Sequence, residues 1–258
     1  MSIGESGRYS GDMGLYREHI LPVLVDRACG TAGLKKWRGE LSSGLSGRVL
    51  EIGFGSGLNV EHYPSTVEKV LAVEPSAKGF RIAQRRIDSS PVPVELVGLD
   101  GQSIPLPDDS CDDALCTFAL CTIPDVDAAL AEVRRVLRPG GRFHFLEHGL
   151  APDAGVAAWQ RRLEPLQRRV ADGCHLTRDP VALVRGAGFA LDDVDQRYGI
   201  GPKPWSWFTR GWQSISGSAN RPSIVGPATR MTAAAGSSRK RTVGSVGLRP
   251  MIRFDGPA

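Results

Sequence analysis

The chain has 258 residues, of which 41% are hydrophobic and 23% are charged, and its formal net charge at pH 7 is +4. A chain of this length can bury one full α/β core, and its hydrophobic content is ordinary for a soluble globular protein. The five cysteines are odd in number and include no C-x-x-C pair, which favours reduced thiols in a cytoplasmic protein over a disulfide framework or a zinc site. We therefore predict no metal. No apolar run approaches the ~20 residues that span a bilayer, and the first twenty residues lack the apolar stretch of a signal peptide.

The predicted elements alternate between strands and helices along the chain. A helix is expected first, over residues 16–29. Strands follow near 48–53, 69–74, 92–99, 113–121 and 141–147. Helices are expected near 57–63, 77–88 and 126–138, and later elements are a helical segment over 156–170, a short helix over 179–185 and closing strands over 189–197 and 205–212. Such alternation predicts parallel strands joined by right-handed crossovers, with ligands bound at the C-terminal edge of the sheet.

The first predicted strand runs directly into three alternating glycines, Gly53, Gly55 and Gly57. A strand that ends in such a turn lets main-chain N–H groups approach a ligand closely, and a helix start after it offers further donors. The spacing is G-x-G-x-G, whereas the dinucleotide motif is G-x-G-x-x-G, and Glu51 lies just before the turn. These two details point away from NAD.

Two acids follow at the ends of the next two strands. Glu74 ends the second strand, where a carboxylate can accept both hydroxyl groups of a ribose. Asp100 ends the third strand and is followed by Gly101 and Gln102. Further on, the run Leu-Arg-Pro-Gly-Gly at 137–141 predicts the stop of a helix before a buried strand.

Taken in order, these motifs resemble those of the class I S-adenosylmethionine-dependent methyltransferases, over roughly residues 14–212. Glu51 with the three glycines resembles the first motif of that family, Glu74 its ribose-binding acid and Asp100 its adenine-contacting acid. The resemblance implies a doubly wound, Rossmann-like α/β fold with a mostly parallel seven-stranded sheet, an antiparallel last strand and an N-terminal helix over the cofactor. It also implies S-adenosylmethionine as the cofactor, with the following binding residues: Glu51, Gly53, Gly55, Gly57, Asn59, Glu74, Pro75, Asp100, Gly101, Gln102 and Thr117.

Later segments are similar to a narrower group. Residues 145–148, 159–160 and 172–178 resemble the methyltransferase-like family that includes small-molecule thiol S-methyltransferases. The same core also resembles quinone-biosynthesis C-methyltransferases and phospholipid N-methyltransferases. The resemblance implies methyl transfer to a small apolar acceptor, with a thiol sulfur favoured. The alternatives are C- or O-methylation of a quinone-like or phenolic ring, and a non-catalytic cofactor-binding scaffold or sensor.

Methyl transfer needs in-line attack on a methyl group that already has a good leaving group, so the enzyme mostly positions the acceptor, excludes water and, where needed, takes a proton. His148 follows the fifth strand and is the first candidate base, because imidazole titrates near neutral pH. A role in holding a loop is the alternative. Asp172 and His175 form a second candidate pair, in which the acid could orient the imidazole, unless both only form a polar turn before the next helix.

The segment 156–170 combines helical apolar spacing with four arginines on the other side. A basic amphipathic helix can lie on a membrane, so a weak membrane-surface contact is possible. We favour instead a crossover helix packed on the sheet.

The positive charge of the chain lies at its C-terminal end. Residues 214–258 contain seven Lys or Arg and one Asp, a balance of +6, so residues 1–213 carry −2. We predict one methyltransferase domain over 1–213, including its N-terminal helical lid, and a basic, low-complexity, mostly disordered tail over 214–258. Because the predicted domain is slightly acidic and has no basic patch interleaved with aromatic residues, a small-molecule acceptor is expected and a nucleic-acid partner is not. The oligomeric state is left open.

Overall fold

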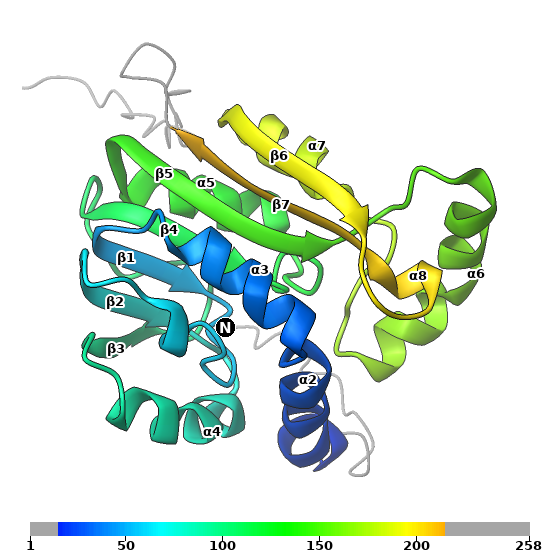
Figure 1. Ribbon diagram of the computed structural model, residues 1–258, viewed down its shortest axis with the longest axis horizontal. Helices are drawn as coiled ribbons and strands as arrows, with labels where there is room; N and C mark the ends of the chain where they lie inside the picture. The colour runs from blue at the N-terminus through cyan, green and yellow to red at the C-terminus, as the bar shows by residue number, and fades with distance from the viewer. Residues whose placement is uncertain (1–14, 215–258) are drawn as a thin grey trace, which may run out of the picture. The chain divides into compact units, whose positions relative to one another are not determined.

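Seven strands form one mixed sheet within residues 15–214, the part of the chain that the computed structural model describes (Figure 1). In spatial order the strands are β3 (Val94–Gly98), β2 (Val67–Val73), β1 (Gly47–Ile52), β4 (Cys111–Thr117), β5 (Leu137–His148), β7 (Trp207–Ser214) and β6 (Ala190–Tyr198). Within this sheet β7 alone runs in the direction opposite to the other six strands. The predicted fold, a mostly parallel seven-stranded α/β sheet with an antiparallel last strand, is confirmed.

Helices cover both faces of the sheet. The helical elements within residues 15–214 are the π-helical turn η1 (Tyr16–Ile20), α2 (Leu21–Cys29), α3 (Ala32–Ser42), the 3-10 turn η2 (Val60–His62), α4 (Ala77–Asp88), α5 (Val126–Val136), α6 (Ala154–Val170), α7 (Pro180–Gly186) and α8 (Lys203–Ser206). One core cluster contains Leu130 and Val133 of α5 with Val184 of α7. A second cluster contains Leu41 of α3 and Ala83 of α4. In Figure 1, α3 lies in front of the sheet, and α5 and α7 lie behind it.

The central strands are continuous apolar runs because both of their faces are covered. Val49 and Leu50 of β1 and Val70 of β2 have no exposed surface. The strand order reverses between β1 and β4, where Ile52 pairs with Cys116. The carboxyl ends of these two strands therefore form the switch point at which α/β sheets bind ligands. In Figure 1 the arrowheads of β1 and β5 point to the side on which α2 and α6 lie.

Some local expectations were wrong. The helix expected over 57–63 is only the short turn η2, because Gly57 has a left-handed backbone conformation, with φ of 74°, that does not start an α-helix. The strand expected over 113–121 ends at Thr117, because Phe118 has φ of 57°. Helix α3 was not predicted at all, since two glycines interrupt its pattern.

Helix α6 does not pack its apolar face on the sheet, contrary to the interpretation that we favoured. Only Ala157 and Gln160 of this helix are buried, whereas Trp159 is 56% and Leu166 is 60% exposed. The helix lies beyond the sheet next to α8 (Figure 1). The weak membrane-surface contact stays a prediction.

No helix within residues 15–214 is long and apolar enough to cross a bilayer. The predicted tail lies outside the described residues except for Ser214, which ends β7. The boundary between domain and tail stays a prediction.

Candidate functional site

The glycine turn after β1 needs glycine for two reasons. Gly53, Gly55 and Gly57 have φ of 70°, 56° and 74°, a region that L side chains rarely adopt. In addition, a Cβ atom on Gly53 would lie 2.2 Å from the Cβ atom of Ala119, in the loop after β4. The turn and that loop are therefore packed directly against each other.

Glu74 lies against the same turn. Its carboxylate accepts hydrogen bonds from the backbone N–H groups of Gly55, at 2.6 Å, and Ser76, at 2.8 Å. The side chain is 6% exposed, and burial raises its pKa. The structure thus brings the predicted ribose acid to the predicted glycine turn.

Glu51 is the centre of a buried polar network. Asn59 donates to Glu51 Oε1 at 2.9 Å and to Thr117 Oγ1 at 3.0 Å, and the hydroxyl of Tyr63 donates to Glu51 Oε2. Burial raises the pKa of Glu51 to about 7, although the bonds from Tyr63 and Asn59 oppose this effect. Three of the predicted cofactor-binding residues are therefore joined directly, and Tyr63 is a member that sequence analysis missed.

A buried cation from α3 joins this network. The guanidinium of Arg38 donates to Asn59 Oδ1 at 2.7 Å and to Thr117 Oγ1 at 2.6 Å, and it lies 5.3 Å from the ring centroid of Phe118. Arg38 is 3% exposed, and burial lowers its pKa. Its Nε atom is buried and has no hydrogen-bond partner among residues 15–214. A buried guanidinium with a spare donor fits an anionic group such as a carboxylate.

The residues expected at the adenine lie one strand further along the sheet. Val73 at the end of β2 pairs with Gly98 at the end of β3, so the loop that begins at Leu99 adjoins Glu74. Asp100 is exposed and accepts two hydrogen bonds from Gln102, from N and Nε2, both at 2.9 Å. These bonds lower the pKa of Asp100. Gly101 lies between Asp100 and Gln102 in the sequence, and Pro75, which follows Glu74, is exposed.

Helix α2 contacts the glycine turn through polar groups. Ser56 donates to Asp26 Oδ1 at 2.6 Å, and Arg86 forms a 3.0 Å ion pair with Asp26. Arg86 also donates to the carbonyl of Ser56 at 2.7 Å. No residue of α2 is buried. The N-terminal helix thus lies against the turn through a few polar contacts, and its role as a lid over the cofactor stays a prediction.

His148 lies at the end of β5 beside two cysteines. Its Nε2 atom is 3.1 Å from Cys174 Sγ, which in turn is 3.8 Å from Cys121 Sγ. Hydrogen bonding with Cys121 and His148 holds the pKa of Cys174 below its usual value, against the effect of burial. The neighbouring Glu147 is fully buried and accepts from the N–H groups of Ala119 and Leu120 at 2.8 and 3.0 Å. It fixes the loop that carries Cys121.

The predicted pairing of Asp172 with His175 needs correction. His175 Nδ1 lies 2.7 Å from Glu164 Oε1 of α6, so the acid that holds this imidazole is Glu164. The other oxygen of Glu164 accepts from the N–H groups of Leu176 and Thr177, at 2.7 and 3.0 Å. Asp172 lies in the turn after α6 with φ of 49°. The arrangement holds a loop on α6, and a catalytic role for Asp172 and His175 stays a prediction.

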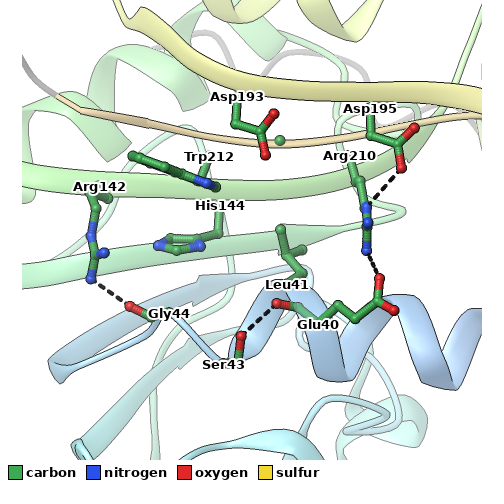
Figure 2. Close-up of a pocket in the computed structure, with 11 residues that line it drawn as sticks. Glu40, Leu41, Ser43, Gly44, Arg142, His144, Asp193, Asp195, Arg210 and Trp212 are labelled. Atoms are coloured by element: carbon green, nitrogen blue, oxygen red, sulfur yellow. Dashed lines mark hydrogen bonds and ion pairs between the residues drawn. The ribbon is translucent and has the colours of Figure 1, made fainter.

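A cavity of about 340 Å³ lies elsewhere, between α3 and strands β5, β6 and β7 (Figure 2). Arg210 bonds both Glu40 and Asp195, and Arg142 donates to the carbonyl of Gly44 (Figure 2). None of the predicted cofactor-binding residues lines it. We therefore place the candidate site at the glycine turn and not in this cavity.

Comparisons with known proteins agree with this geometry. A family profile described as "Methyltransferase domain" matches residues 50–145. The thiol S-methyltransferase TMT1B of Homo sapiens is 33% identical over 175 residues, 66% of this chain and 70% of that protein. TMT1B of Rattus norvegicus is 33% identical over 167 residues, 63% of this chain and 66% of that protein. The chain thus spans about two thirds of the length of these relatives.

The fold is shared with solved structures. The YcgJ protein of Bacillus subtilis is 18% identical with a TM-score of 0.56, and the match covers 71% of this chain and 98% of that one. The strand order, the glycine turn and these matches define a class I S-adenosylmethionine-dependent methyltransferase. Within that class, the chain belongs to the family of the thiol S-methyltransferases TMT1A and TMT1B.

Proposed function

We propose that this enzyme transfers a methyl group from S-adenosylmethionine to the sulfur of a small apolar thiol. The observation that carries the proposal is the position of His148, Cys174 and Cys121 at the C-terminal edge of β4 and β5. The names of the relatives support a thiol acceptor.

The residues at the glycine turn fit this methyl donor. When bound, the donor supplies a methyl group on a sulfonium that is already a good leaving group. Glu74 would accept hydrogen bonds from the ribose hydroxyls, and the backbone N–H groups of the turn would lie against the amino-acid part. Arg38, with its spare buried Nε, would pair with the carboxylate, and Glu51 would offset the ammonium charge. Asp100 would contact the adenine.

We call the C-terminal ends of β4 and β5, with Cys121, His148 and Cys174, the acceptor edge. It lies directly beside the glycine turn. Ala119 packs on Gly53, and Cys121 follows two residues later. An acceptor held at the cysteine cluster would therefore be next to the donor, as in-line transfer requires.

The thiolate is the reactive form of a thiol, so the site has to favour loss of the thiol proton. His148 was predicted to take it. Its Nε2 atom already bonds Cys174, whereas its Nδ1 atom is buried and has no hydrogen-bond partner among residues 15–214, so Nδ1 is the nitrogen left for a proton from the acceptor. The role of His148 as a base stays a prediction.

Titration calorimetry with S-adenosylmethionine and S-adenosylhomocysteine, with NAD as the control ligand, tests the donor site. Product analysis by mass spectrometry with an alkanethiol, a phenol and a reduced quinone then tests the acceptor. We expect both sulfur ligands to bind, NAD not to bind, and the thioether to form fastest. Faster methylation of the phenol or the quinol would refute the thiol proposal, and NAD binding without the sulfur ligands would refute the donor site.

A further inference from the structure

Three donor atoms converge at the acceptor edge. His148 Nε2 lies 3.1 Å from Cys174 Sγ, the two sulfur atoms lie 3.8 Å apart, and all three atoms are within 4.8 Å of one another. Both cysteines are buried, and His148 is half-buried. They come from the loop after β4, the end of β5 and the loop before α7, so the fold itself assembles the cluster.

The distance between the two sulfur atoms matches that in a tetrahedral zinc site. With Zn–S bonds of about 2.3 Å, two thiolates on a tetrahedral ion have their sulfur atoms roughly 3.8 Å apart. The distance between Cys121 and Cys174 is already 3.8 Å. With a Zn–N bond of about 2.0–2.1 Å, nitrogen and sulfur are roughly 3.6 Å apart, so His148 and Cys174 would separate by about half an ångström on binding.

The chemistry of the donors also fits zinc. Two thiolates and an imidazole suit zinc, whereas magnesium and calcium take oxygen ligands. A disulfide is not formed, since Cys121 and Cys174 are free thiols at a distance far above the ~2.05 Å of an S–S bond.

The loops that carry the ligands are fixed by neighbouring hydrogen bonds. The N–H group of His175 donates to the carbonyl of Cys121 at 2.8 Å, which joins the two cysteine-bearing loops. Arg178 donates to the carbonyls of Leu120 and, at 2.8 Å, Ile123. Together with the bonds that Glu147 accepts, these contacts hold the cluster in place before a ligand arrives.

Contrary to the prediction of no metal from the sequence, we propose that Cys121, His148 and Cys174 bind Zn²⁺ and leave one coordination position open, and that the sulfur of the acceptor thiol takes this position. Three protein ligands with an open fourth position are typical of catalytic zinc sites. The metal site stands on the geometry alone, whereas the role of the open position rests on the proposed function.

The reaction balances without an oxidant or a reductant. The acceptor thiol gives its proton to water as its sulfur binds the ion, because the cation lowers the pKa of the thiol. A lone pair of this sulfur forms the new C–S bond with the methyl group. The old C–S bond breaks and its electron pair goes to the donor sulfur, which leaves as a neutral thioether. The product, also a thioether, has no charge and is a weaker ligand than the thiolate it replaces.

Elemental analysis of the full-length protein, purified without chelator, tests the metal site. We expect about one zinc per chain, and loss of this zinc in Cys121→Ser, His148→Asn and Cys174→Ser. Cys111→Ser is the matched control, because Cys111 is buried at the opposite end of β4 and should keep the metal. S-Adenosylhomocysteine binding verifies that each variant folds. Substoichiometric zinc in the wild type, or equal zinc in all variants, would overturn the site.

Cobalt substitution tests the open position. Co²⁺ in the site should show thiolate-to-metal charge-transfer absorption that the three ligand variants lack. Adding an alkanethiol should change this spectrum, and a phenol should not. If the cobalt spectrum appears but no thiol is methylated, the metal site stands and the proposed function fails. If thiols are methylated at full rate by metal-free protein, the proposed function stands and the role of the metal is refuted.

Discussion

Replacing Glu51 by Gln tests whether the fold keeps a destabilising carboxyl for cofactor binding. Glu51 is 1% exposed, and burial raises its pKa from 4.5 to about 7. Between these two values the unfolded chain has lost a proton that the folded protein still holds, so the free energy of unfolding falls as the pH rises. Above the folded pKa the whole penalty applies, and the gap between the two values corresponds to about 3 kcal/mol.

The variant Glu51→Gln cannot ionise and keeps an oxygen acceptor within the network of Tyr63 and Asn59. Relative to the wild type, its free energy of unfolding should rise by about 3 kcal/mol between roughly pH 5 and pH 8, as measured by urea denaturation. Burial also raises the pKa of other acids such as Glu74 and Glu147. Their contributions to the pH dependence of the free energy of unfolding are the same in the variant and the wild type, so they cancel in the difference.

The control is Glu68→Gln, because Glu68 is exposed on the neighbouring strand β2. It serves as the reference for the effect of replacing a glutamate on the surface of the sheet. If the pH dependence of the stability difference is the same for Glu51→Gln as for Glu68→Gln, the buried carboxyl does not carry the penalty and the reasoning is refuted. At the higher pH the variant should also bind S-adenosylmethionine more weakly, by about 1.5–3 kcal/mol, if the carboxylate offsets the ammonium charge.

Three further substitutions probe the same site. Gly53→Ala should lower the free energy of unfolding and abolish cofactor binding in calorimetry, because its Cβ atom would lie 2.2 Å from that of Ala119. Adding Ala119→Gly should restore part of the free energy of unfolding, and no recovery would show that this contact is unimportant. Glu74→Ala should weaken S-adenosylmethionine binding by about 1.5–3 kcal/mol, and unchanged affinity would remove Glu74 from the site. Arg38→Gln should weaken S-adenosylhomocysteine binding but not that of methylthioadenosine, which lacks the carboxylate; equal losses for both ligands would refute the pairing.

Sequence analysis predicted the parts of the fold that depend on local patterns. The apolar runs of β1 and β2, the glycine turn and the acid Glu74 are each readable within one short segment, because buried parallel strands and left-handed turns restrict residue type locally. Helix α3 was missed because Gly33 and Gly39 interrupt its helical pattern, and its stability comes from tertiary packing of Leu41. Arg38 was missed with it.

The contacts that define the acceptor edge are long-range and leave no local pattern. Cys121 and Cys174 are 53 residues apart, so the usual short spacing of metal ligands is absent. The partner of His175 is Glu164, eleven residues away on another element, while the nearer acid Asp172 suggested a pair by spacing alone. Only the arrangement of β4, β5 and α6 brings these side chains together.

The attachment of α2 has a consequence for turnover. This helix contributes no buried residue, and the ion pair between Asp26 and Arg86 that helps hold it to the turn joins partly exposed groups, worth at most about 1 kcal/mol. Detaching the helix therefore leaves the two hydrophobic cores intact. If α2 covers the bound donor, as predicted, exchange of spent donor for fresh donor should not require the domain to unfold, and it should become faster as salt weakens the ion pair between Asp26 and Arg86.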